Sequence, residues 1–212
     1  MIRRPPRSTR KESSAASDVY KRQRYGRLCE HARTERQLYV GDQRIKTGRC
    51  KLMIDENGYR SNVGIVLANA TGQVLWARRV GGRNAWQFPQ GGVNQGETSE
   101  QALYRELYEE VGLRADSVRL LGQTDDWLHY DLPQRMRRNN STPGFVGQKQ
   151  KWFLLELVDD DAAIQVDHSC KPEFDQWCWV SYYYPISQII DFKRAVYRQA
   201  LVRLAPLLPM PS

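Results

Sequence analysis

Residues 86–113 read WQFPQGGVNQGETSEQALYRELYEEVGL, and this stretch carries most of what the sequence says about the fold. Its first part holds Pro89, Gly91 and Gly92, which interrupt regular structure. The pattern that follows predicts a helix over 97–111, ended by Gly112, because glycine commonly terminates helices. A loop rich in glycine therefore leads directly into a helix.

The predicted helix has an apolar face and an acidic face. Leu103, Leu107 and Val111 recur at helical spacing, so we expect them to pack into a core. Tyr104 and Tyr108 fall at the margin of that face. The acidic residues of the helix lie beside it.

Three glutamates of this helix, Glu106, Glu109 and Glu110, fall within an arc of about 100°. Their carboxylates repel one another unless a cation lies between them, so the pattern predicts a metal site. A solvated helix face paired with nearby Lys or Arg is the alternative. It does not explain the fixed glycines or Arg105, which could pair with Glu97 and hold the loop against the helix.

The segments around this region predict a mixed β-sheet between α-helices, of the α/β (α+β) class. Two apolar, β-branched runs, 61–69 and 72–80, flank a turn and predict a hairpin. Further strands are predicted over 118–130, 150–158 and 177–183. A final helix is predicted over 185–205, with Pro185 at its start.

The basic charge of the chain belongs mainly to its first 52 residues. Residues 1–52 hold 15 Lys and Arg against 5 Asp and Glu, whereas residues 53–212 hold 17 against 19. The first segment lacks periodic apolar residues, so we interpret 1–52 as a disordered basic extension of non-native or read-through sequence. The patterned domain is placed at 53–205, followed by a short tail, 206–212.

Composition excludes some broad classes. No apolar run approaches the roughly 18–20 residues that cross a bilayer, so we expect no membrane association. The four cysteines have no CxxC spacing and the chain does not start with a secretory signal. These features predict a cytoplasmic protein.

The glycine loop and the acidic helix together match a known spacing, G-x5-E-x7-R-E-U-x-E-E-x-G-U, in which U is a bulky aliphatic residue. The matching positions are Gly91, Glu97, Arg105, Glu106, Leu107, Glu109, Glu110, Gly112 and Leu113. This 23-residue pattern is far more specific than an isolated glycine-rich loop. In it the chain resembles the Nudix hydrolases.

The resemblance implies a Nudix fold and hydrolysis of a phosphoanhydride. It implies Glu106, Glu109 and Glu110 as ligands of Mg²⁺, for which Mn²⁺ or another divalent cation could substitute, and as catalytic residues. A fourth carboxylate outside this 23-residue pattern, the Nudix box, commonly assists in the family, and Glu173, in the loop KPEFDQW, is our candidate. Gly91, Glu97, Arg105 and Gly112 have structural roles in the box.

The resemblance extends from residue 53 to about residue 204. The stretches that carry it are GYRSNVGIV, WARR, AWQFPQGGVNQGE, GQKQKWFLLEL, PEFDQWCWVSYYYP and FKRAVYR. They are similar to the branch of the family that removes pyrophosphate from the 5′-triphosphate end of messenger RNA. The product is a 5′-monophosphate, which promotes RNA decay.

Besides a sanitising nucleotide triphosphatase, two rival functions stay open. One is hydrolysis of dinucleoside polyphosphates such as diadenosine polyphosphates, which share a polyphosphate flanked by nucleosides. The other is a non-catalytic Nudix module that binds nucleotides and regulates partners; the intact glutamate set argues against it. An activating protein partner cannot be inferred from the sequence.

An RNA 5′-triphosphate needs cations for its phosphates and flat or polar groups for its bases. The candidates are Arg60, Arg79, Gln148, Lys149, Lys151, Phe192 and Lys193, and the basic loop residues Arg135, Arg137 and Arg138. Phe192 could equally be buried in the apolar stripe of its helix. The other aromatic residues in these runs are predicted to be core: Trp86, Phe88, Trp152 and Phe153.

Overall fold

The computed structural model of the chain describes residues 53–82, 85–137 and 144–208. The predictions for 1–52, for Arg138 and for the last residues of the tail fall outside these described residues.

Two long neighbouring strands, β1 (Tyr59–Ala68) and β7 (Gly147–Leu157), form the centre of the sheet and run parallel. All other strand pairs are antiparallel, so the sheet is mixed, as the sequence predicts. The remaining strands are β2 (Val74–Arg79), β3 (Trp86–Gln87), β4 (Gln90–Gly92), β5 (Val118–Gln123), β6 (Leu128–Asp131) and β8 (Phe174–Val180).

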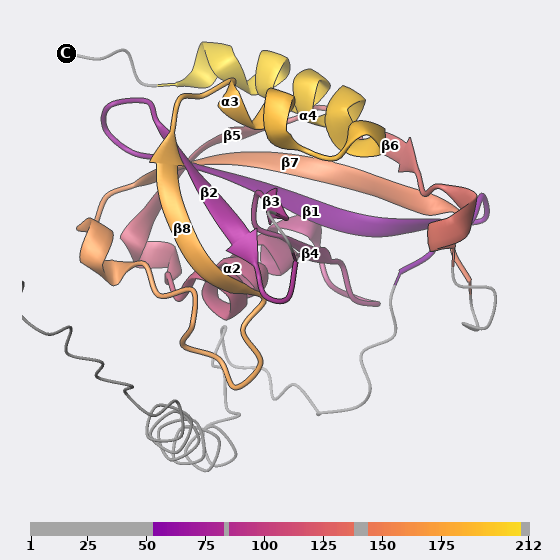
Figure 1. The fold of residues 1–212 in the computed structure, drawn as a ribbon, viewed down its shortest axis with the longest axis horizontal. Helices are drawn as coiled ribbons and strands as arrows, with labels where there is room; N and C mark the ends of the chain where they lie inside the picture. Colours follow the sequence, from indigo (N-terminus) through magenta and orange to yellow (C-terminus); the bar gives the residue numbers. More distant parts are fainter. Residues whose placement is uncertain (1–52, 83–84, 138–143, 209–212) are drawn as a thin grey trace, which may run out of the picture. The chain divides into compact units, whose positions relative to one another are not determined.

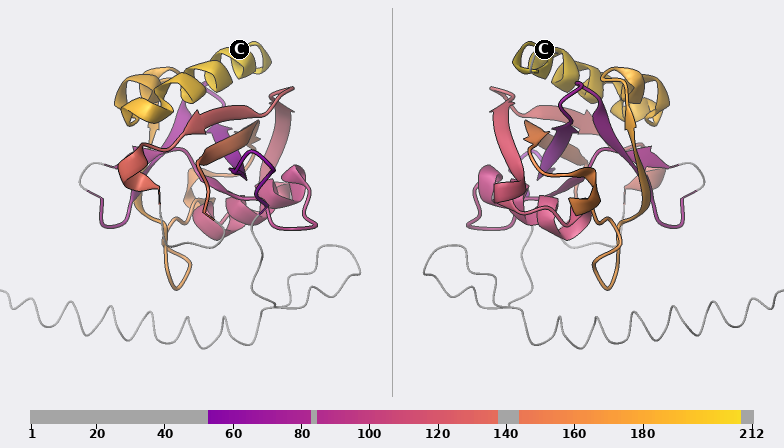
Figure 2. Two further views of the ribbon diagram at one scale, coloured as in Figure 1. Left: turned by 90° about the vertical axis from the view of Figure 1, so that its right-hand side faces the viewer. Right: turned by 90° about the vertical axis from the view of Figure 1, so that its left-hand side faces the viewer.

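Figure 1 shows the sheet between two helical layers, with α2 (Ser99–Val111) on one side and α4 (Asp191–Leu204) on the other. The two side views of Figure 2 show the same order of layers. Each side has its own apolar core, because successive residues of a strand point to opposite faces. Neither helix, nor any other in the described segments, is long and apolar enough to cross a membrane.

One close contact in the core between the sheet and α4 needs a glycine. A Cβ on Gly64 of β1 would lie 2.6 Å from the ring of Trp152, its cross-strand neighbour on β7. The missing side chain therefore leaves the space that the indole fills, and Trp152 is fully buried there.

Helix α2 is positioned by caps at both ends. It begins at Ser99, two residues later than the sequence predicts, because Thr98 and Gln101 form a capping box. Thr98 Oγ1 accepts a hydrogen bond from the Gln101 backbone N–H at 3.1 Å, and the Gln101 side chain accepts one from the Thr98 N–H at 2.9 Å. Gly112 ends the helix at a φ of 78°, as predicted.

The segment 118–130, predicted as one strand, forms two. Strands β5 and β6 pair end to end along β7 and are separated by a turn. In this turn the Thr124 hydroxyl donates to the Asp126 carbonyl at 3.0 Å and accepts from the Trp152 N–H at 3.2 Å. A side chain that satisfies backbone groups locally thus breaks the run.

The final helix, predicted as one element over 185–205, is also divided. A short α3 (Tyr184–Gln188) stops at Ile189, and α4 starts at Asp191. Ile189 and Ile190 are extended, with ψ of 149° and 140°. Ile189 is buried and Ile190 is exposed. Their apolar spacing fits a helix, but their backbone is not helical.

Candidate active site

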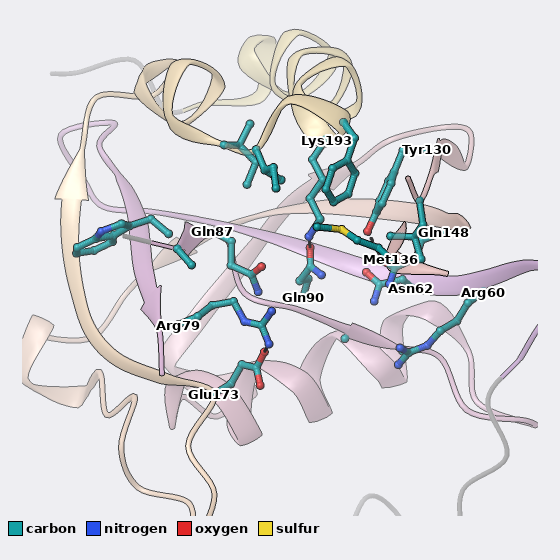
Figure 3. Close-up of a pocket in the computed structure, with 18 of the residues that line it drawn as sticks. Arg60, Asn62, Arg79, Gln87, Gln90, Tyr130, Met136, Gln148, Glu173 and Lys193 are labelled. Carbon is teal, nitrogen blue, oxygen red and sulfur yellow. Dashed lines mark hydrogen bonds and ion pairs between the residues drawn. The ribbon is translucent and has the colours of Figure 1, made fainter. Parts of the chain in front are cut away.

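A cavity of about 890 Å³ opens where β1, β4 and β6 meet α2 and the first turn of α4 (Figure 3). Its acidic wall comes from α2 and from the loop before β8, and its basic wall from β1, β2 and α4. Elements that are far apart in the chain therefore contribute opposite charges to one space.

Glu106 and Glu110 form the acidic wall. They lie one turn apart on α2, with only 9% and 8% of their surfaces exposed. Strand β4 passes so close that a Cβ on Gly91 would lie 1.7 Å from the Glu106 carboxyl carbon. Glu110 Oε2 accepts a hydrogen bond from the Gln90 backbone N–H at 2.9 Å.

Burial makes these two carboxylates costly to ionise. It raises the pKa of Glu110 well above its ordinary value, and the neighbouring charge of Glu106 raises it further. Burial also raises the pKa of Glu106, although Arg105 opposes the shift. A bound cation would relieve both carboxylates.

Arg105 ties the glycine loop to the helix. Its guanidinium makes two hydrogen bonds to the Glu97 carboxylate, at 2.8 and 2.9 Å, so the ion pair expected from the sequence is present. It also donates to Glu106 Oε1 at 2.6 Å and to the Gly92 carbonyl at 2.8 Å. Burial lowers the pKa of Arg105, but the bonds to Glu97 and Glu106 outweigh burial and raise it overall.

Two of the predicted ligands are less enclosed. The side chain of Glu109 is 52% exposed and lies 3.3 Å from Arg105 Nη1. Glu173 lines the cavity directly before β8, where its Oε1 lies 2.5 Å from Arg79 Nη2. Within residues 53–82, 85–137 and 144–208, no three His, Cys, Asp or Glu side chains already converge as metal ligands. The pair Glu106 and Glu110 nevertheless fits a hard divalent cation, since both are buried carboxylates.

Three cations face the acidic wall: Arg60, Arg79 and Lys193. Arg60 packs against Gly92, and burial lowers its pKa. Lys193 Nζ donates to Gln90 Oε1 at 3.2 Å, and burial lowers the pKa of Lys193 to about 8. Figure 3 shows Lys193 above Gln90, and Arg79 paired with Glu173 below.

Flat side chains complete the cavity. Phe192 is partly buried but lines it, with its ring 5.8 Å from that of Tyr130. The Tyr130 hydroxyl donates to Gln148 Oε1 at 2.7 Å. Trp86, predicted as core, is only partly buried and also lines the cavity, whereas Phe88, Trp152 and Phe153 are core.

Several predicted phosphate ligands do not reach this cavity. Lys149 pairs with Asp55 at 2.8 Å, and Lys151 donates to the Asp125 carbonyl at 2.7 Å. Gln148 does line the cavity, and Lys149 and Lys151 point to the opposite face of β7 because successive residues of a strand alternate. Arg135 and Arg137 flank the lining residue Met136 without lining the cavity themselves.

Several lining residues were not predicted from the sequence, among them Asn62, Gln90, Tyr130, Met136 and Phe145. An amide inside an apolar strand, as at Asn62, is the one signal that could have identified a member of this set, because buried amides need partners.

Comparisons with known proteins agree with this geometry. A family model described as the NUDIX domain matches residues 58–198. The RNA pyrophosphohydrolase of Pseudomonas paraeruginosa is 62% identical over 156 residues, which cover 74% of this chain and 98% of that protein. That of Acinetobacter baylyi is 59% identical over 157 residues, covering 74% and 94%.

Among solved structures, the E. coli dihydroneopterin triphosphate pyrophosphohydrolase superimposes with a TM-score of 0.55 at 23% identity. It covers 67% of this chain and 94% of that one, and at this identity it supports the fold alone. The family match and the close relatives place the chain in the Nudix family, whose hydrolases generally need divalent cations.

Proposed function

We propose that this chain is an RNA pyrophosphohydrolase, which removes pyrophosphate from the 5′-triphosphate end of RNA and leaves a 5′-monophosphate. One observation carries the proposal: the buried carboxylates of α2 share a cavity with Arg60, Arg79 and Lys193. Acidic groups for a cation and basic groups for phosphate are both needed to handle a polyphosphate.

Glu106 and Glu110 would hold the metal ion, for which we propose Mg²⁺, with Glu109 and Glu173 completing the ligand set. The ion supplies charge neutralisation at phosphorus and a more acidic bound water. The two relatives named RNA pyrophosphohydrolase support this choice of reaction over other Nudix activities.

The chain's own cations and rings would bind and orient the RNA. Arg60 and Lys193 would pair with phosphate oxygens, and Arg79 would exchange part of its contact with Glu173 for phosphate. Phe192, at the start of α4, offers a ring on which an unpaired base can stack.

Incubating the purified protein with Mg²⁺ and RNA carrying a labelled 5′-triphosphate tests the proposal. We expect release of pyrophosphate and a 5′-monophosphorylated RNA, with no reaction in EDTA. Glu109→Gln should fold normally and lose turnover by orders of magnitude.

Diadenosine tetraphosphate, assayed in parallel, separates the nearest rival. Hydrolysis of this dinucleotide without action on RNA would overturn our proposal in favour of a dinucleoside polyphosphate hydrolase. Nucleotide binding without turnover of either compound would instead indicate a regulatory module.

A further inference from the structure

Three amide side chains link Lys193 to the floor of the cavity. Lys193 Nζ lies 3.2 Å from Gln90 Oε1. Gln150 Nε2 lies 3.4 Å from the same oxygen and 2.7 Å from Asn62 Oδ1. Gln150 and Asn62 are 0% and 2% exposed and are direct neighbours across β1 and β7.

The ammonium group fixes the direction of every amide in this chain of contacts. An ammonium can only donate, so the Gln90 atom that faces Lys193 must be its oxygen. The Gln150 atom that faces this oxygen must then be its NH2 group. That NH2 group can pair only with the oxygen of Asn62, so Asn62 Oδ1 is directed at Gln150.

The orientation of Gln150 has a cost. Its Oε1 is buried and finds no hydrogen-bond partner among the described residues. An unsatisfied buried acceptor is unfavourable, so the two contacts of Nε2 must hold the amide in this direction.

Because Asn62 Oδ1 pairs with Gln150, the NH2 group of Asn62 is left as the donor of this side chain. Its Nδ2 makes no hydrogen bond to the described residues, and the side chain lines the cavity. Arg60 lies two residues earlier on the same face of β1 and lines the cavity too (Figure 3). An NH2 donor beside a guanidinium suits an anionic oxygen acceptor.

We propose that Asn62 donates a hydrogen bond to a phosphate oxygen of the substrate, and that Gln150 is the positioning residue that keeps its amide in the donating direction. This inference rests on the proposed function for the identity of the polyphosphate. Gln150 touches no substrate and acts only through Asn62 and Gln90.

Steady-state kinetics on a 5′-triphosphorylated oligonucleotide with Mg²⁺ tests the inference in wild type, Gln150→Met, Asn62→Ala and the double variant. We expect each single variant to raise KM by about three- to tenfold, the effect of one lost hydrogen bond, with little change in kcat. The double variant should have a KM close to that of Asn62→Ala, because both changes remove the same contact.

Thr124→Val is the matched control. Thr124 is as buried as Gln150 and hydrogen-bonded, but it lies outside the cavity. It should lower the unfolding temperature, because a buried hydrogen bond is lost, and leave KM at the wild-type value. A wild-type KM in Gln150→Met, or multiplicative effects in the double variant, would overturn the inference.

Calorimetric binding of inorganic tripolyphosphate separates this inference from the proposed function. Weaker binding in Gln150→Met and Asn62→Ala supports the donor role even if wild type fails to cleave RNA, a result that defeats only the proposed function. Equal binding in all four proteins overturns the donor role even if RNA is cleaved.

Discussion

Glu110 is buried like a core residue, yet its carboxylate has the chemistry of a metal ligand. Its carboxylate is buried beside Glu106, which raises its pKa, so the charged form opposes folding unless a cation is bound. The same burial that suits metal binding therefore destabilises the metal-free protein.

Glu110→Gln should consequently stabilise the metal-free protein and abolish its activity. The neutral amide removes the buried charge while its oxygen can still accept from the Gln90 N–H. We expect the midpoint of thermal unfolding in EDTA to rise by about 2–4 °C, the shift that about 1 kcal/mol produces in a domain of this size. Turnover should fall by orders of magnitude.

Glu109→Gln is the control for this change, because the Glu109 side chain is half exposed. It should lose turnover without gaining stability. A Glu110→Gln protein that unfolds at or below the wild-type temperature would show that the buried charge is not a source of instability.

Lys193 predicts a pH dependence of substrate binding. Burial lowers its pKa to about 8, so the ammonium loses its proton as pH rises through that value, and phosphate loses a partner. KM should therefore increase above about pH 8. Stability should increase over the same range, because the unfolded chain holds the proton up to the ordinary lysine pKa of 10.5 whereas the folded chain releases it near 8.

Measuring KM from pH 7 to 9.5 in wild type and Lys193→Met checks this assignment. The variant should have a high KM that no longer increases across this range. An equally steep increase in the variant would assign the titration to another group.

At the scale of elements, the close approach of β4 to α2 sets the position of the carboxylates. Gly91→Ala should lower turnover by about 100-fold, since a Cβ would lie 1.7 Å from the Glu106 carboxyl carbon and displace it. Divalent-ion titration should show weaker binding.

Gly96→Ala separates displacement from general instability. Gly96 has a φ of 83° and nothing within 4 Å of an added Cβ, so alanine should cost about 1–2 kcal/mol of stability through backbone strain alone. Its turnover should stay near wild type. Equal losses of turnover in both variants would contradict the role given to the approach of β4.

Elements with local signals were predictable, and elements decided by tertiary contacts were not. Helix α2 has its apolar stripe and its Gly112 stop in the sequence. The break at Ile189 and Ile190 leaves no such trace, because two apolar residues at helical spacing look the same whether or not the backbone is helical.

The site shows the same division. The spacing of the box brings Glu97 to Arg105 because both lie on one local loop and helix. The GQKQK run of β7 contains equally plausible lysines and glutamines, and only the facing of the strand decides that Gln148 lines the cavity. The alternation of a strand places the lysines and the glutamines on opposite faces. It does not indicate which of the two sets faces the substrate.

At the scale of the whole molecule, the basic excess and the described cavity belong to different parts of the sequence. Among the described residues, those that line the cavity lie between Arg60 and Lys193, whereas the basic excess is in residues 1–52 of the sequence. We expect deletion of 1–52 to leave kcat and KM on triphosphorylated RNA unchanged at physiological salt, since the fragment 53–212 retains the whole cavity.

The kinetic assay of the 53–212 fragment beside the full chain checks this expectation, with salt varied in both. A loss of turnover in the fragment would show that the basic segment takes part in the reaction. A difference confined to low salt would reflect nonspecific attraction to RNA.

The cavity is lined by β1, the first strand in the sequence, and by α4, the last α-helix. It is therefore complete only when α4 has docked on the sheet. A product that stops short of α4 would still carry the glutamate helix and could sequester ions, yet it would lack a lysine and a ring to grip a transcript. The capacity to bind a polyphosphate substrate would therefore arise only after α4 has been made and docked.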